Sequence, residues 1–175
     1  MSTGAADAAT GQVHETTPTR DDEFATFYER HHGAVARAIG VTIGDSALGI
    51  EAADEAMARA YQRWPKIRSY DNPAGWTYRV GLNWSRSWVR RHRRTDHLHT
   101  PDAVDPRPAD VDLERAIAAL SADHRAVVVC RFLLDWSIET TADALHLRPG
   151  TVKSRLSRAL SELERHLGDS EERSR

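Results

Sequence analysis

A proline-rich acidic stretch divides the chain and limits the size of any folded unit on either side. The segment Thr95–Glu114 (TDHLHTPDAVDPRPADVDLE) holds six acidic residues, three prolines and one arginine. Proline excludes such a segment from helix interiors, and repulsion between like charges keeps it extended. In a chain of 175 residues, this predicts two small domains, over 21–94 and 113–167, joined by a linker over 95–112. The polar ends, 1–20 and 168–175, are expected to be disordered tails.

Both domains are predicted to be helical, because no stretch alternates apolar and polar residues for long, as a strand would. Apolar residues recur instead at spacings of three and four. We expect one helix from about Asp21 to Ile39 and a second from about Ser46, whose apolar stripe is extended by Trp64 and ended by Pro65. The expected fold class is all-α.

The segment after Asn72 carries two distinct helix faces. Asn72 and Pro73 are typical of an N-cap followed by proline at the first helical position, and this helix is expected to reach about Arg94. One face is an apolar stripe of Trp76, Val80, Trp84 and Trp88. The other carries Arg79, Asn83, Arg86, Arg90 and Arg93 at spacings of four and three. No acidic residue accompanies these arginines, which favours a polyanion such as nucleic acid over a merely solvated charged face.

The second domain contains a candidate helix-turn-helix. Asp112 or Ser121 is expected to cap its first helices. Ser137 is a good N-cap for a helix that buries Ile138, Thr141, Ala142 and Leu145, and HLRPG (146–150) forms a turn. Thr151 is expected to cap the next helix, with Val152, Leu156, Ala159, Leu160 and Leu163 facing inward. Its outward residues, Lys153, Ser154, Ser157 and Arg158, suit base-edge and phosphate contacts in a major groove.

Several classes of function are disfavoured. A single cysteine, Cys130, excludes an internal disulfide framework, and in an apolar helix it is expected to be core rather than reactive. His92, His97 and His99 lie close together without metal-ligand spacing, so we expect no metal and no cofactor. No nucleophile–base pair suggests an enzyme. The chain has no apolar run long enough to span a membrane and no signal-peptide pattern, so a cytoplasmic location is expected.

These motifs resemble those of bacterial RNA polymerase sigma factors of the extracytoplasmic-function (ECF) group. The segment 150–159 (GTVKSRLSRA) resembles the family's minus-thirty-five recognition helix, within a region 4 domain. The segment 73–83 (PAGWTYRVGLN) resembles the helix of region 2 that reads the minus-ten element, and 54–61 (DEAMARAY) resembles the helix that docks on the polymerase. Leu82, Ser87 and His146 stand where the family usually has Arg, Asp and Gly.

The resemblance implies roles for particular residues. Glu51, Asp54, Glu55 and Arg59 would contact the clamp helices of the β′ subunit, and region 4 would contact the β flap. The loop at about 66–72, including Tyr70, Asp71 and Asn72, would pocket a flipped base. Asn83 would lie near base edges, with Arg79, Arg86, Arg90 and Arg93 along the single-stranded backbone. The minus-thirty-five set would include Lys153, Ser154, Arg155, Ser157 and Arg158.

The expected function is therefore transcription initiation, with core RNA polymerase and double- and single-stranded promoter DNA as partners and an anti-sigma factor as a further one. Tyr70, Trp76 and Tyr78 are candidates for base stacking, with core packing the favoured interpretation for Trp76, Trp84 and Trp88. The acidic linker would either thread the polymerase cleft or act as a spacer. Two alternatives remain: a stand-alone helix-turn-helix regulator that binds an operator without polymerase, and a helical RNA-binding or adaptor protein.

Overall fold

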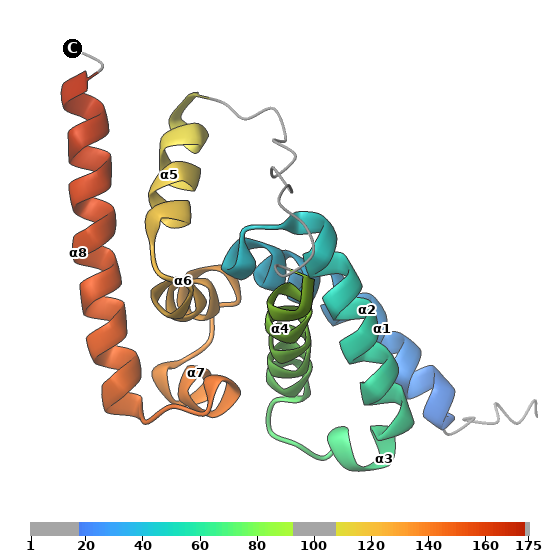
Figure 1. Cartoon of the computed structure of the whole chain (residues 1–175). Coiled ribbons are helices and arrows are strands. Elements are labelled where there is room, and N and C mark those ends of the chain that lie inside the picture. The colour runs from blue at the N-terminus through green and yellow to red at the C-terminus, as the bar shows by residue number, and fades with distance from the viewer. Residues whose placement is uncertain (1–17, 93–107, 174–175) are drawn as a thin grey trace, which may run out of the picture.

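The computed structural model describes residues 18–92 and 108–173, and within these ranges it contains eight α-helices, one π-helical turn and no strand (Figure 1). The prediction of an all-α fold is confirmed. The predicted N-terminal tail up to residue 17 lies outside the described residues. So do residues 95–107 of the predicted linker, Arg93 and the last two residues.

Four helices form the first half of the chain: α1 (Arg20–Ile43), α2 (Ser46–Gln62), α3 (Trp64–Ile67) and α4 (Pro73–His92). The predicted start of α4 is confirmed, since the Asn72 side chain accepts a hydrogen bond from the Gly75 amide at 2.8 Å. The prediction that Pro65 ends the second helix is wrong. That helix ends at Gln62, and Pro65 lies in the first turn of α3, where a proline needs no amide hydrogen.

Helices α1, α2 and α4 pack closely because small residues lie where they cross. A Cβ atom on Gly49 of α2 would lie 2.6 Å from the Cα of Gly40 of α1. A Cβ atom on Gly81 of α4 would meet the side chain of Ile39 at 2.5 Å and the backbone of Ala52 at 2.8 Å. The three backbones therefore approach more closely than larger side chains would permit.

The second half of the chain contains α5 (Pro108–Ala119), α6 (Ala122–Val128), the π-helical turn η1 (Val129–Leu133), α7 (Ile138–Leu145) and α8 (Pro149–Arg173). Ser121 and Ser137 cap α6 and α7 as predicted. Asp112 caps nothing, because α5 begins at Pro108, within the predicted linker.

Helix α8 differs from its prediction at both ends. It begins at Pro149, so Thr151 lies inside it, and it continues past Leu167 to Arg173. Figure 1 shows it as a long rod with α5 alongside. Ala116 and Leu120 of α5 and Val128 of α6 form a buried cluster with Ala159 and Leu163 of α8.

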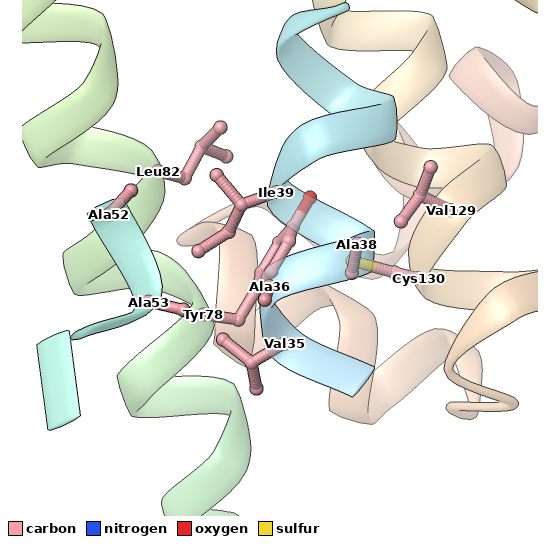
Figure 2. Packing of buried hydrophobic residues seen from close by; sticks show 10 residues of the cluster. All are labelled: Val35, Ala36, Ala38, Ile39, Ala52, Ala53, Tyr78, Leu82, Val129 and Cys130. Atoms are coloured by element: carbon pink, nitrogen blue, oxygen red, sulfur yellow. The ribbon is translucent and has the colours of Figure 1, made fainter. Parts of the chain in front are cut away.

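The largest buried cluster joins the two halves of the chain. Val35, Ala38 and Ile39 of α1 pack with Tyr78 of α4, and with Val129 and Cys130 of η1 (Figure 2). The ring of Trp136, just before α7, meets Tyr78 edge-on with 5.8 Å between centroids. We call this contact of α1 and α4 with α6, η1 and α7 the closed arrangement.

Candidate nucleic-acid interface

The cationic face of α4 lies at the surface, as the sequence predicted. Asn83, Arg86 and Arg90 are exposed, whereas Arg79 is half-buried. The guanidinium of Arg90 donates to the Ser87 hydroxyl at 3.2 Å. The helix carries no acidic residue, so a neutralising carboxylate can come only from another element, and the face attracts anions.

The buried face of α4 is not the predicted tryptophan stripe. Trp76, Val80, Trp84 and Trp88 are only half-buried, at the edges of the packed face. The fully buried side consists mainly of small residues, together with the larger Tyr78 and Leu82. Its members are Ala74, Gly75, Thr77, Tyr78, Gly81, Leu82 and Ser85. Trp84 packs against the cluster that joins the two halves, and Trp76 packs against a second buried cluster, formed by residues of α1 to α4 that include Phe27, Met57 and Trp64. These contacts support core packing for the two tryptophans.

Tyr78 is unavailable for base stacking, which corrects one of the predicted stacking candidates. Its side chain is completely buried, and its hydroxyl shares a hydrogen bond with the Thr42 hydroxyl at 2.8 Å. Burial, with Cys130 beside it, raises the pKa of Tyr78 well above its ordinary value. Tyr78 is therefore a structural residue of the closed arrangement, while Tyr70, exposed on the loop before α4, keeps an accessible ring.

The loop before α4 borders a cavity of about 630 Å³. Tyr70, Asn72, Trp76 and Arg79 line one side, and residues of the second half line the other: Trp136, Thr140, Asp143 and Ala144. The Asn72 side-chain nitrogen is buried without a hydrogen-bond partner. Aromatic rings beside an unused donor and a guanidinium suit a planar, hydrogen-bonding group such as a nucleobase.

The helix-turn-helix is present as predicted, except that Leu160, expected to face inward, is exposed. His146 ends α7 in the left-handed conformation with φ 54°, which a histidine adopts more readily than most residues. The Leu147 amide then donates to the Ala142 carbonyl at 2.9 Å and closes the turn. Val152 and Ala159 of α8 are completely buried, while Lys153, Ser154, Ser157 and Arg158 are exposed.

Arg155 behaves differently from the other basic residues of α8. It is half-buried, and its guanidinium contacts the Asp123 carboxylate of α6 at 3.0 Å. Arg86 of α4 contacts the second oxygen of the same carboxylate at 3.4 Å. Sequence reasoning missed Asp123, because it lies far along the chain from both arginines and belongs to no motif.

Charged residues also line the exposed side of α2. Glu51 and Asp54 are exposed, Asp54 accepts from His32 at 2.7 Å, and Glu55 pairs with Arg59 at 2.7 Å. Ile50 of the same helix is 51% exposed. An exposed apolar side chain among charges is typical of a protein contact surface.

A second exposed apolar site was missed from the sequence. Phe132 of η1 is 64% exposed and Leu133 beside it is 40% exposed. The wider π-helical turn directs Cys130 inward and leaves these two at the surface. No sequence signal marked them, since a regular helix was expected there.

Among the described residues, no three His, Cys, Asp or Glu side chains form a group that could hold a metal ion. His97 and His99 lie outside the described ranges. Burial raises the pKa of the Cys130 thiol to about 12, so this group is protonated at neutral pH. No helix within the described ranges is both long and apolar enough to cross a membrane.

Comparisons with known proteins match both halves of the chain. The family model for Sigma-70, region 4 matches residues 110–163. The ECF RNA polymerase sigma factor SigL of Mycobacterium tuberculosis is 32% identical over 148 residues, covering 78% of this chain and 84% of that protein. The RNA polymerase sigma-E factor of Streptomyces antibioticus is 31% identical over 153 residues, covering 83% of this chain and 84% of that protein.

A solved structure has the same fold. It is the sigma factor RpoE of Bartonella quintana in complex with the anti-sigma factor NepR, with a TM-score of 0.71 and 21% identity. The match covers 83% of this chain and 97% of the solved chain. The likeness therefore includes helices from both halves.

Proposed function

Since this chain belongs to the ECF group of RNA polymerase sigma factors, we propose that it binds core RNA polymerase, reads the minus-thirty-five and minus-ten promoter elements and opens the DNA. The observation that carries this is the presence of two basic helix faces, on α4 and on the start of α8, in one chain. The action is binding and strand separation, without bond chemistry by this chain. It takes place in the cytoplasm, with the polymerase.

The chain comprises two functional domains in this proposal, region 2 over 21–94 and region 4 over 113–167. Region 4 reads the minus-thirty-five element by inserting the start of α8 in the major groove. Lys153, Ser154, Ser157 and Arg158 are exposed there, and the helix N-terminus adds backbone donors for phosphate. Arg155 also belongs to this set, provided that DNA displaces Asp123 from it.

Region 2 holds the minus-ten element as a single strand. Asn83 reads base edges, and Arg79, Arg86 and Arg90 follow the backbone, together with Arg93 outside the described residues. The loop of Tyr70, Asp71 and Asn72 receives an unstacked base. Extruding a base costs a few kcal/mol and costs least at weakly stacked steps, so DNA opening itself becomes selective.

The α2 surface docks on the polymerase. Glu51, Asp54, Glu55 and Arg59 form its charged part and contact the β′ clamp helices. Region 4 contacts the β flap, and the exposed apolar side chains of Phe132 and Leu133 offer a surface for that contact. An anti-sigma factor is a further proposed partner, because the structural relative of Bartonella quintana was solved with one.

The proposal is tested by gel filtration of the purified chain with core polymerase free of other sigma factors. We expect co-elution at near-equal stoichiometry. Glu51→Lys reverses a charge on the α2 surface and should weaken co-elution. The matched control is Glu29→Lys on α1, an exposed acidic residue outside the proposed surface.

Absence of co-elution from a folded chain would contradict the proposal. If that chain still bound duplex DNA alone, it would be an operator-binding regulator instead. If Glu51→Lys co-elutes as well as wild type, the α2 surface does not contact the polymerase. The sigma assignment would then depend only on whether the wild-type chain co-elutes.

A further inference from the structure

A histidine of α1 holds one of the acidic residues that are proposed to contact the polymerase. The Nε2 atom of His32 lies 2.7 Å from a carboxylate oxygen of Asp54 on α2. Since a carboxylate only accepts hydrogen bonds, Nε2 carries the hydrogen and donates it. The contact crosses from one helix to the other, and it fixes the direction in which the Asp54 carboxylate points.

The His32 ring is itself held by a row of aromatic side chains. It stacks on Tyr28, one turn earlier in α1, with 4.6 Å between ring centroids and 17° between the ring planes. Phe24, a further turn earlier, contacts the Tyr28 ring at 6.4 Å and the buried Trp64 ring at 5.3 Å. The row connects His32 to the core of the first half and restricts rotation of its imidazole.

The two partners of this contact differ in exposure. The His32 side chain is 21% exposed, whereas that of Asp54 is 58% exposed. Among the residues that the structure describes, no hydrogen bond or ion pair engages the second carboxylate oxygen of Asp54. One oxygen is therefore held from below by His32, and the other is open to a cationic group of a partner.

The other charges of α2 indicate what kind of partner group would meet this oxygen. Glu55 forms an ion pair with Arg59 at 2.7 Å within the helix, so its charge is compensated locally. Within the described ranges, neither Glu51 nor Asp54 forms an ion pair with a lysine or arginine. Complementary charge fixes the register of an interface, so we expect the partner surface to carry basic side chains here.

We propose that His32 is a positioning residue of the polymerase contact. Held by Tyr28, it fixes one oxygen of Asp54, so that the other oxygen meets a basic side chain of the polymerase in a preset orientation. Ordering a side chain costs free energy when an interface forms, and an orientation fixed beforehand removes part of that cost. An edge of α1 thereby supports the α2 surface. The inference rests on the proposed function for the identity of the partner.

The role of His32 is measured by competition for core polymerase. Core polymerase is loaded with wild-type chain that carries a fluorophore on its N-terminus, and unlabelled variants displace it. We expect His32→Ala to bind about two- to fivefold more weakly than wild type, the range that one exposed polar pair supports. His32→Ala that competes as well as wild type would overturn the inference.

A conservative variant tests the hydrogen bond itself. His32→Gln places a nitrogen donor at nearly the same distance from the backbone as Nε2, so it should recover part of the affinity that His32→Ala loses. A loss in His32→Gln as large as that in His32→Ala would show that the donated hydrogen is unimportant, and it would also overturn the positioning role.

A double variant separates positioning from direct contact. In Asp54→Ala the imidazole has no carboxylate to hold, so adding His32→Ala should cause no further loss of affinity. If His32→Ala weakens binding equally in the wild-type and Asp54→Ala backgrounds, His32 acts independently of Asp54. That result would contradict positioning and make His32 a direct contact or a purely structural residue.

The matched control is His31→Ala, which removes the same side chain one residue earlier. The His31 ring packs on Phe27 with 4.9 Å between centroids, rather than on Asp54, so its affinity should equal that of wild type. Competition is measured well below the unfolding temperature, where circular dichroism shows each variant to be folded. Equal losses in His31→Ala and His32→Ala would assign the effect to α1 as a whole and overturn the inference.

The same assay separates this inference from the proposed function. If unlabelled wild-type chain neither binds nor competes for core polymerase, the proposed function fails and the inference fails with it. If wild type competes and every His32 variant competes equally well, the sigma assignment stands and only the role of His32 is wrong.

Discussion

The hydroxyl groups of Tyr78 and Thr42 lie 2.8 Å apart in a completely buried site between α4 and α1. The Thr42 hydroxyl donates its single hydrogen to the Ala38 carbonyl at 2.7 Å, so it accepts from the Tyr78 hydroxyl in the bond that the two share. Cys130 of the second half lies beside the Tyr78 hydroxyl and contributes to its raised pKa. One tyrosine thereby links three helical segments.

Tyr78→Phe should lower the free energy of unfolding by about 0.5–1.5 kcal/mol, the net value of one hydrogen bond. Thr42 keeps its bond to Ala38, so no buried hydroxyl loses its only partner. Urea unfolding measures the change. Binding to single-stranded DNA should remain at least as tight as in wild type, and a large loss of binding in folded Tyr78→Phe would return Tyr78 to the list of stacking residues.

Stability should fall at high pH because of two buried acids. Burial raises the pKa of Cys130 from 9.0 to about 12 and also raises that of Tyr78. The folded state favours the protonated groups, so their contribution is complete below the pKa of the unfolded thiol and is lost as pH rises toward about 12. Urea unfolding across this range should show a shallower decline for Cys130→Ala, and an unchanged decline would contradict the raised pKa.

Gly49→Ala should weaken the packing of α1 on α2. The added Cβ would lie 2.6 Å from the Cα of Gly40, and overpacking of this kind costs about 1–3 kcal/mol. Gly33→Ala is the control, because it lies in α1 with nothing within 4 Å of its Cβ position. The free energy of unfolding of Gly33→Ala should rise by about 0.5–1 kcal/mol, because alanine favours the helix more than glycine does. The thermal unfolding midpoints of the two variants are compared. Equal midpoints would argue against the close approach of α1 and α2 at Gly49.

Arg158→Ala should weaken binding to promoter duplex. If Arg158 contacts a base, the binding free energy should fall by about 1–3 kcal/mol. If it contacts a phosphate, the slope of log affinity against log salt concentration should become smaller by about one. The control is Arg165→Ala, an exposed arginine further along α8. The comparison uses holoenzyme binding to duplex at several salt concentrations. Equal affinities and slopes for the two variants would exclude Arg158 from the recognition surface.

Asn83→Ala should change the preference for the minus-ten sequence while leaving polymerase binding intact. Asn83 is exposed on α4, and an amide that pairs with a base edge discriminates by about 1–3 kcal/mol. Transcription from promoters with single minus-ten substitutions measures the preference. Co-elution with core polymerase is the control, and its loss in a folded variant would assign Asn83 to the polymerase contact instead.

Local signals in the sequence predicted the starts of α4 and α7, whereas the first helix, expected to end at Ile39, continues to Ile43. Asn72 and Ser137 cap their helices through side-chain hydrogen bonds to nearby amides, so short-range chemistry is sufficient to find them. Pro65 and Thr151 were misassigned for a related reason. Proline suits the first turn of a helix as well as the position after one, and Pro149 starts α8 before Thr151 can cap it.

The packed side of α4 could not be read from the positions of large apolar residues. Helices approach closely where side chains are small, so Ala74, Gly81 and Ser85 are buried while Trp88 remains half-exposed. The exposed arginines and the outward face of α8 were predictable, because charge and helical period alone define them. Asp123 was not, since its contacts depend on how the two halves pack.

The direction in which the side chains of the π-helical turn at Val129–Leu133 point depends on the number of residues in it. An α-helix rotates successive side chains by about 100°, and the wider turn accommodates one residue more. Deleting a single residue there would rotate the chain beyond it, bringing Phe132 toward the core or Cys130 out of it. Insertions and deletions should therefore be tolerated between the two halves but not in η1, where a one-residue change would alter how the helix-turn-helix faces the rest of the molecule.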